Sequence, residues 1–264
     1  MKMPQIGLGT FRLKGQDAYN SVKTGLEVGY RHIDTAQIYD NEEEVGKALA
    51  DSGLPRAEVF ITTKIWIENL GKEKLIPSLK ESLSKLQTSY VDLVLIHWPS
   101  KEFSLKETLD ELMKAKTLGL TKEIGISNFP IKETQEAIDL IGANNIYTNQ
   151  IEIHPFLQNK KLVNFLNEKG IRVTAYMPLA YGKVMTDESL KAIATQHKVS
   201  PADISMSWLL DQNFTVIPSS TKKVNLENNL KTKKNFLSKD DVVRIQTLDR
   251  NDRLANPGFS PIWD

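Results

Sequence analysis

Eight short runs of mostly apolar and β-branched residues recur along the chain, and a longer segment with helical periodicity follows each run. The segment LIPSLKESLSKLQ, residues 75–87, is an example, because leucines at positions 75, 79, 83 and 86 fall on one helix face. Several of the short runs are apolar almost throughout, as expected of parallel strands that are buried on both faces. The runs occupy residues 6–10, 31–35, 59–65, 91–98, 123–127, 148–153, 171–176 and 215–218.

Eight strand–helix units in 264 residues predict an α/β protein that folds as a (β/α)8 TIM barrel. A doubly wound parallel sheet is the alternative arrangement of the same elements. No linker, low-complexity tract or internal repeat divides the chain, so we expect a single domain over residues 1–264. The last segment, NDRLANPGFSPIWD, has no periodicity and contains two prolines, which predicts a tail that lies on a surface.

The charge and composition of the chain exclude several classes of partner and chemistry. The 34 basic and 33 acidic residues leave a net charge of +1, so nothing indicates binding to nucleic acid or to a membrane surface. Cysteine is absent, which excludes disulfides, thiolate zinc sites and a cysteine nucleophile. Because neither a secretory leader nor a long apolar run is visible, we expect a cytoplasmic protein. The absence of an obvious apolar surface stripe favours a monomer.

Three successive predicted strands end in an ionisable residue. Asp34, Lys64 and His97 each follow an apolar or β-branched run. In a barrel these positions meet at the face where βα loops converge and where active sites form. An unpaired buried charge is costly, whereas an aspartate and a lysine on neighbouring strands can neutralise each other. The alternative is a purely structural ion pair at the barrel mouth, but a third polar residue in the same layer counts against it.

Tyr39 lies five residues after Asp34, in DTAQIYDNEEEVG, within a loop long enough to fold back over the strand ends. A neighbouring lysine ammonium favours the phenolate, so we expect Lys64 to lower the pKa of Tyr39. A tyrosine tuned in this way can act as a general acid. Taken alone, Tyr39 is expected to be a loop residue whose ring packs against the protein.

The remaining motifs narrow the chemistry further. The chain has no P-loop, HExxH, GxSxG or complete GxGxxG motif, and its histidines lack nearby carboxylates with metal-ligand spacing, so no metal site is expected. The stretch IPSSTKKVNLENN follows the last predicted strand, where barrels tend to bind phosphate. The alternative reading of this stretch is a solvated, basic helix N-terminus.

The motifs DTAQIYDNEEEVG, ITTKIW, LIHWP, IGISNF, NQIEIHP and IPSSTK occur in this order, and together they resemble the aldo-keto reductases along nearly the whole chain. The resemblance implies a (β/α)8 barrel that uses NADPH to reduce the carbonyl group of a small-molecule aldehyde or ketone. The expected substrates are 2,5-diketo-D-gluconate and methylglyoxal.

The resemblance also implies a role for each residue of the proposed site. Tyr39 becomes the proton donor, Lys64 the cation beside it, Asp34 the partner of that lysine, and His97 the group that orients the carbonyl oxygen. The implied substrate-binding residues are Trp66, His97 and Trp263. The implied cofactor-binding residues are Thr10, Phe11, Ser127, Asn128, Gln150, Tyr176, Leu179, Ser219, Ser220, Thr221, Lys222, Asn225, Asn228 and Asn229.

The chain departs from the pattern of the family at three places. Many relatives begin with a β-hairpin that closes the barrel floor, and this chain starts too close to its first strand to form more than half of one. Ser219 and Asn225 stand where the common phosphate loop has a lysine and an arginine. Lys222 or Lys223 could supply charge to a 2′-phosphate instead. Met177 replaces the serine that usually follows the stacking tyrosine.

Two other functions are compatible with a barrel that carries these residues. A buried lysine can form a Schiff base, as in an aldolase that would use Lys64. A non-catalytic subunit that binds a nicotinamide cofactor is the second alternative. The Asp34–Lys64 pair disfavours the first, because a charged lysine is a poor nucleophile, and the complete set of polar residues gives no reason to expect the second.

Overall fold

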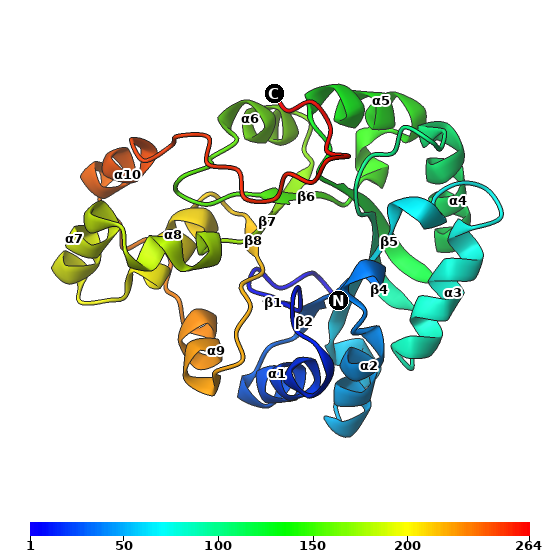
Figure 1. Cartoon of the computed structure of the whole chain (residues 1–264), viewed down its shortest axis with the longest axis horizontal. Helices are drawn as coiled ribbons and strands as arrows, with labels where there is room; N and C mark the ends of the chain where they lie inside the picture. The colour runs from blue at the N-terminus through cyan, green and yellow to red at the C-terminus, as the bar shows by residue number, and fades with distance from the viewer.

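The computed structural model describes all 264 residues, and eight parallel strands form one sheet in the order β1 to β8. Figure 1 shows the strands around the centre and the helices outside them. The strands are β1 Leu8–Gly9, β2 His32–Asp34, β3 Phe60–Ile65, β4 Val91–Ile96, β5 Thr121–Ser127, β6 Thr148–Glu152, β7 Arg172–Tyr176 and β8 Thr215–Val216. The helices are α1 Gly15–Val28, α2 Glu42–Asp51, α3 Leu75–Lys85, α4 Leu105–Thr117, α5 Ile131–Ile141, α6 Lys160–Glu168, α7 Glu188–His197, α8 Pro201–Asp211, α9 Lys223–Leu230 and α10 Lys239–Gln246.

The sheet closes on itself between its first and last strands. Ile6, just before β1, forms a parallel bridge with Val216 of β8. The amide of Gly7 donates to the Val216 carbonyl over 2.9 Å, and the amide of Gly9 donates to the Pro218 carbonyl over 3.0 Å. Sequential strand order with this closure confirms the (β/α)8 barrel and excludes the doubly wound sheet.

Every predicted strand overlaps an observed one, and the helix predicted at residues 75–87 is α3, with Leu75, Leu79 and Leu83 buried. The two strands at the closing seam, β1 and β8, are the shortest, with two residues each. The seam is held by the backbone hydrogen bonds described above rather than by long strand pairing.

The barrel floor is closed without a β-hairpin. Met3 is buried against Phe60, Leu93 and Leu95, with Tyr147 packed beside them. The amide of Met3 also reaches the Tyr147 hydroxyl at 3.4 Å. No strand precedes β1, and Met3 of the N-terminal segment packs at the floor in place of a hairpin.

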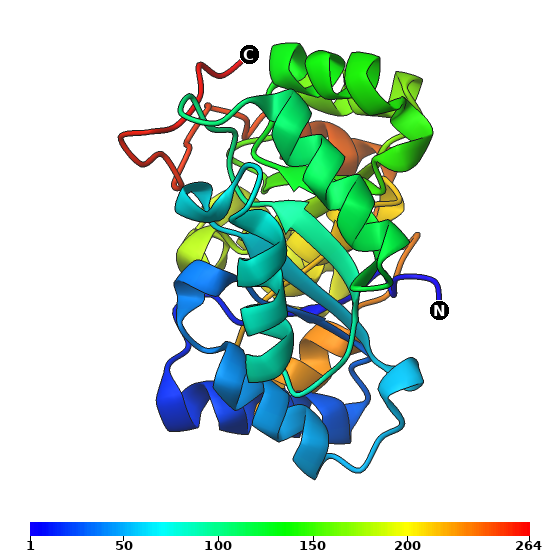
Figure 2. The ribbon, with the colours of Figure 1, turned by 90° about the vertical axis from the view of Figure 1, so that its right-hand side faces the viewer.

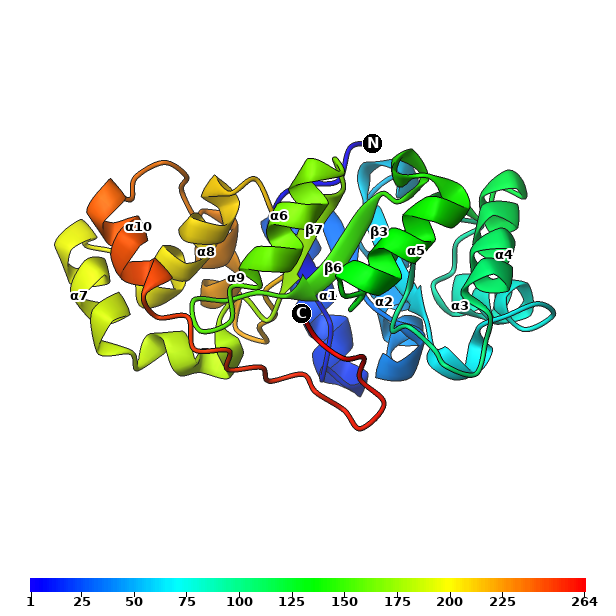
Figure 3. The same cartoon turned by 90° about the horizontal axis from the view of Figure 1, so that it is seen from above.

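The C-terminal tail, residues 251–264, contains no helix or strand. Figures 2 and 3 show that the tail and the N-terminus lie at opposite ends of the barrel. The tail therefore covers part of the face at which the strands end, and the predicted surface tail is confirmed. No helix of the structure combines the length and apolar character needed to cross a bilayer.

Candidate active site

Asp34, Lys64 and His97 come together at the carboxyl ends of β2, β3 and β4. All three side chains are buried. The ammonium of Lys64 forms an ion pair with Asp34 and also donates to the backbone carbonyl of Thr35 over 2.8 Å. The charged pair is therefore largely satisfied inside the barrel, as a buried charge requires.

Tyr39 ends a short 3-10 helix, η1 Gln37–Tyr39, that follows β2. This turn brings the Tyr39 hydroxyl to 3.4 Å from the Lys64 ammonium. The Tyr39 ring also lies edge-on to the His97 ring, with 5.6 Å between centroids. The structure thus groups all four residues that the sequence selects as catalytic.

The predicted direction of the Tyr39 pKa is wrong. Burial raises the pKa of Tyr39 well above its ordinary value, and the negative charge of Asp34 adds to the rise. Lys64 does not reverse this effect, because its charge is already matched by Asp34. The hydroxyl of Tyr39 therefore keeps its proton at neutral pH, which is the state that a proton donor needs.

Burial also acts on the two nitrogen bases of the site. It lowers the pKa of Lys64, although the attraction of Asp34 opposes the change. Burial lowers the pKa of His97 well below its usual value, and the nearby Lys64 charge lowers it further. His97 is therefore neutral at physiological pH. Its buried Nδ1 has no hydrogen-bond partner.

Gln150, on β6, has a role that the sequence does not reveal. Its Nε2 donates to Asp34 Oδ2 over 2.7 Å, so Asp34 is held by Gln150 and Lys64 together. The expected contact of Gln150 with a cofactor carboxamide would have to use the rest of its amide group. Gln150 therefore connects the acidic end of the ion pair to the neighbouring polar residues at the ends of β5 and β7.

Those neighbouring residues form a hydrogen-bonded row. The Tyr176 hydroxyl donates to Asn128 Oδ1 over 2.7 Å, and Asn128 Nδ2 donates to the His97 carbonyl over 3.0 Å. The Ser127 hydroxyl donates to the Gln150 carbonyl over 2.8 Å. Amide groups beside a half-buried phenol ring fit a flat ligand that carries a carboxamide, as a nicotinamide does.

The other predicted cofactor residues lie in three places around the mouth. Thr10 is buried and donates to the Asp34 carbonyl over 3.1 Å, while the exposed Phe11 packs against Tyr39 with 5.1 Å between ring centroids. Leu179 follows β7, in the loop before the next helical turn. The last group follows β8, in the loop before α9 and in α9 itself: Ser219, Ser220, Thr221, Lys222, Asn225, Asn228 and Asn229.

The loop after β8 is built around Ser220. The Ser21 hydroxyl of α1 donates to the Ser220 carbonyl over 2.8 Å, and the Lys222 amide donates to Ser220 Oγ over 3.1 Å. Lys222 precedes α9 and makes no side-chain cap, so the first amide groups of α9 have no side-chain acceptor. A basic residue beside these amides matches the predicted phosphate position.

An aromatic wall extends from His97 towards the tail. Trp66 lies edge-on to His97, with 5.4 Å between ring centroids, and to Phe259 at 5.6 Å. Trp98 contacts Phe259 at 5.7 Å and Trp263 at 6.0 Å. The predicted Trp66 and Trp263 belong to one wall, and Trp98 and Phe259, which were not predicted to bind substrate, connect them.

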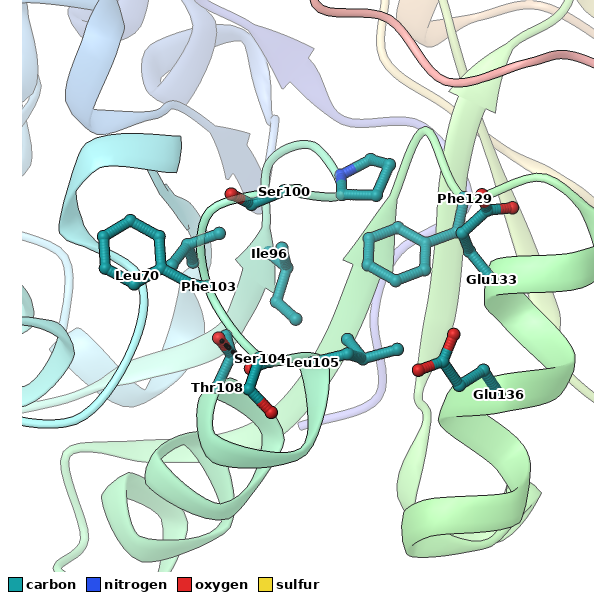
Figure 4. A pocket seen from close by; sticks show the side chains of 11 residues that line it. Leu70, Ile96, Ser100, Phe103, Ser104, Leu105, Thr108, Phe129, Glu133 and Glu136 are labelled. Atoms are coloured by element: carbon teal, nitrogen blue, oxygen red, sulfur yellow. Dashed lines mark hydrogen bonds between the residues drawn. The ribbon is translucent and has the colours of Figure 1, made fainter.

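A cavity of about 300 Å³ lies outside this site, between the β4–α4 loop and α5. Figure 4 shows the side chains that line it. Its floor includes Ile96 and Phe129, and Glu133 and Glu136 of α5 lie at its edge. None of the four predicted catalytic residues lines it. The cavity is therefore separate from the polar cluster at the barrel mouth.

Gln37 is a further residue of the site that the sequence did not single out. Its Oε1 accepts hydrogen bonds from the Trp66 amide over 2.9 Å and from Asn69 Nδ2 over 3.0 Å. Its Nε2 donates to the Ser82 hydroxyl over 3.1 Å. Gln37 therefore links the turn that carries Tyr39 to the loop that carries Trp66. Its position two residues before Tyr39 was the only available signal.

Comparison with known proteins places this geometry in a family. The profile of the Aldo/keto reductase family matches residues 5–250. The chain is 57% identical over 267 residues to the methylglyoxal reductase DkgB of Escherichia coli O157:H7, with 100% of both chains covered. It is 38% identical to a glyoxal reductase of Bacillus subtilis, covering 97% of this chain and 93% of the relative.

Solved structures agree with these sequence comparisons. A crystal structure described as a putative 2,5-diketo-D-gluconic acid reductase B has a TM-score of 0.95 and 37% identity, covering 99% of this chain and 94% of the other. The aldo-keto reductase MGS-M4, from a Medee basin deep-sea metagenome library, has a TM-score of 0.92 and 35% identity, covering 99% and 97%. The chain therefore belongs to the aldo-keto reductase family, and it is an oxidoreductase that acts on carbonyl groups.

Proposed function

We propose that this protein uses NADPH to reduce the carbonyl groups of small aldehydes and ketones, with methylglyoxal and 2,5-diketo-D-gluconate as substrates. The observation that carries the proposal is the Tyr39 hydroxyl 3.4 Å from the Lys64 ammonium of the Lys64–Asp34 pair, with the His97 ring beside it. The substrate names come from similar proteins, a methylglyoxal reductase and a putative 2,5-diketo-D-gluconic acid reductase B.

In this proposal each polar residue has one task. His97 donates a hydrogen bond that orients the substrate carbonyl, and Tyr39 donates a proton to the oxygen as negative charge develops on it. Lys64 stabilises the phenolate that Tyr39 leaves behind, and Asp34 keeps Lys64 in place. The bound cofactor supplies the hydride.

Two groups of residues would hold the two ends of the cofactor. The row of Ser127, Asn128, Gln150 and Tyr176 would hold the nicotinamide end, because it offers amide groups and an aromatic ring together. The loop after β8 and the start of α9 would hold a phosphate end. Lys222, which is exposed, supports a preference for NADPH, since it could pair with a 2′-phosphate.

The proposal also includes the location, the oligomeric state and the partners of the protein. We assign the protein to the cytoplasm, as a monomer with one domain, acting on a small-molecule substrate. The near-balanced charge supports the absence of a nucleic-acid partner.

The Schiff-base alternative is disfavoured by the surroundings of Lys64. Its ammonium is directed at Asp34, at the Thr35 carbonyl and at the Tyr39 hydroxyl, so an attack on a carbonyl carbon would break these contacts. Borohydride trapping with a carbonyl compound would detect such an adduct. The non-catalytic alternative predicts cofactor binding without turnover.

The test is the oxidation of NADPH, and separately of NADH, with methylglyoxal or 2,5-diketo-D-gluconate as the acceptor. We expect turnover with both acceptors and a higher kcat/KM with NADPH. Equal or better rates with NADH would overturn the assigned role of Lys222 but keep the reaction class. Cofactor binding without turnover of either acceptor would contradict the proposed reaction.

A further inference from the structure

Glu152 is a fully buried acid at the carboxyl end of β6, and the proposed reaction gives it no task. Its Oε1 accepts from the Leu254 amide and its Oε2 from the Ala255 amide, each over 2.8 Å. His154 Nε2 lies 2.9 Å from Oε1. Both carboxylate oxygens are therefore used to hold two successive backbone amides of the tail against the barrel wall.

A second anchor holds the far end of the tail. The Asp264 carboxylate accepts from the Ile131 amide, at 3.2 Å and 3.0 Å for its two oxygens, at the start of α5. Two further contacts hold Trp263: the guanidinium of Arg253 lies 3.6 Å from its ring centroid, and its Nε1 donates to Asn256 Oδ1 over 3.0 Å. The tail is thus a chain segment without secondary structure that is fixed at both ends.

The anchored segment supplies two rings of the aromatic wall. Phe259 contacts Trp66 and Trp98, and Trp263 contacts Trp98. Of the four rings of the wall, Trp66 is the one that lies against the His97 ring, with 5.4 Å between centroids. A three-carbon substrate placed at His97 would lie beside Trp66, whereas a six-carbon substrate would extend along the wall towards the rings that the tail supplies.

We propose that Glu152 is a positioning residue that determines substrate preference by fixing the tail, and with it Phe259 and Trp263, over the barrel mouth. This inference rests on the proposed carbonyl reduction. Through the tail, Glu152 would affect the binding of the part of the substrate that lies away from the reacting carbonyl. Loss of its hydrogen bonds to the tail should therefore lower kcat/KM for a six-carbon keto-sugar acid more than kcat/KM for methylglyoxal.

The carboxylate is specifically suited to this contact. Two backbone amides donate to its two oxygens, and hydrogen bonds to an ionised acceptor are stronger than neutral ones. A glutamine at position 152 could accept only one of these bonds, and its amide nitrogen would face a second donor. Glu152→Gln therefore weakens the hydrogen bonds that hold the tail, with almost no change in side-chain size.

The first experiment compares Glu152→Gln with Glu168→Gln, a matched change at an exposed glutamate on the outer helix α6. For Glu152→Gln we expect KM for 2,5-diketo-D-gluconate to rise about tenfold or more, the effect of losing a charge-assisted hydrogen bond. KM for methylglyoxal should rise by less, and Glu168→Gln should match the wild type. Equal losses with both substrates would overturn the proposal, because they would indicate general damage to the barrel.

A second variant leaves Glu152 intact. Ala255→Pro removes the amide hydrogen that Glu152 Oε2 accepts, and it lies in the tail, outside the barrel. We expect the same shift in substrate preference as for Glu152→Gln. Wild-type preference in this variant would contradict the role of Glu152, even if Glu152→Gln itself fails to fold.

A readout that needs no turnover separates this inference from the proposed reaction. Chymotrypsin should cut after Phe259 faster in Glu152→Gln than in the wild type or Glu168→Gln, because the tail is released. An unchanged cutting rate would overturn the anchoring role. If the wild type reduced neither substrate, the proposed reaction would fail, whereas faster cutting would still show that Glu152 holds the tail.

Discussion

Two buried aspartates, Asp34 on β2 and Asp92 on β4, form ion pairs in the barrel, and their surroundings differ. Asp34 pairs at the mouth with Lys64, whose side chain is 0% exposed. Asp92, near the start of β4, accepts from Arg56 at 2.8 Å and from Lys122 at 2.9 Å, whose side chains are 23% and 44% exposed. A backbone amide, that of Ile61, also donates to Asp92 over 3.0 Å.

The difference lies in what the cations meet next. Arg56 and Lys122 both lie over the ring of Tyr90, at 4.2 Å and 4.3 Å, and Arg56 also donates to backbone carbonyls. Lys64 instead meets the hydroxyl of Tyr39, a group whose proton can be transferred. Of the two clusters, we therefore expect the one at the mouth to serve chemistry and the one near the floor to serve stability.

The largest expected effect is that of Tyr39→Phe, which removes the transferable proton while keeping the ring. We expect kcat to fall about 10³-fold, within the usual contribution of a general acid. Cofactor affinity should survive, because the ring and the row of polar residues at β5 to β7 remain. Steady-state kinetics with a fluorescence titration of NADPH checks both points. Near-normal turnover would remove Tyr39 from its assigned role.

The next largest effect should come from Lys64→Met. The variant leaves the Asp34 charge without its cation, and Tyr39 loses the group that stabilises its phenolate. We expect kcat to fall about 10²-fold or more, together with a loss of stability. Rates measured on protein shown to be folded by circular dichroism separate the two losses. A variant that is unstable but fully active would make the mouth cluster equivalent to the floor cluster.

Asp92→Asn provides the contrasting case. Removing this charge leaves Arg56 and Lys122 without their shared carboxylate, so we expect the free energy of unfolding to drop by about 3 kcal/mol. The kcat of the folded enzyme should stay at the wild-type value. Urea denaturation and steady-state kinetics measure the two quantities. A large fall in kcat at unchanged stability would contradict the division between mouth and floor.

The last effect, which leaves kcat aside, concerns the pH dependence of stability and involves a histidine at each end of the barrel. Burial lowers the pKa of His32 to about 4 and that of His97 well below its usual value. Both stay neutral in the fold while unfolded histidines gain protons near pH 6.5. Their contribution to stability is therefore full above about pH 6.5 and is lost as the pH falls towards 4, by about 3 kcal/mol for His32. Urea denaturation across this range measures the loss, and His32→Asn should reduce the slope.

The strand order and the four residues at the mouth could be predicted from sequence because they depend on local patterns. Each strand has its own apolar run, and Asp34, Lys64 and His97 stand at fixed places at the strand ends. The pKa of Tyr39 could not be predicted, because the outcome depends on how much burial and Asp34 outweigh Lys64. That balance follows from three-dimensional contacts.

The remaining unpredicted features join residues that are far apart in the chain. Gln150 reaches Asp34 across 116 positions, and Glu152 reaches Leu254 across 102. No short motif records such pairs. Phe259 was missed for the same reason, since a single aromatic residue in a tail without periodicity does not reveal which side chain it contacts.

The tail also has a consequence for how this enzyme can change over time. Its rings form part of the wall, but it contributes none of the four residues at the mouth. Under the proposal above, substitutions at Phe259 or Trp263 would alter selectivity without disturbing proton transfer. The part of the wall that the tail supplies is thus encoded apart from the four residues at the mouth, whereas Trp66 and Trp98 are encoded beside Lys64 and His97. A lineage could exchange one while inheriting the other, and a laboratory could graft tails between relatives for the same purpose.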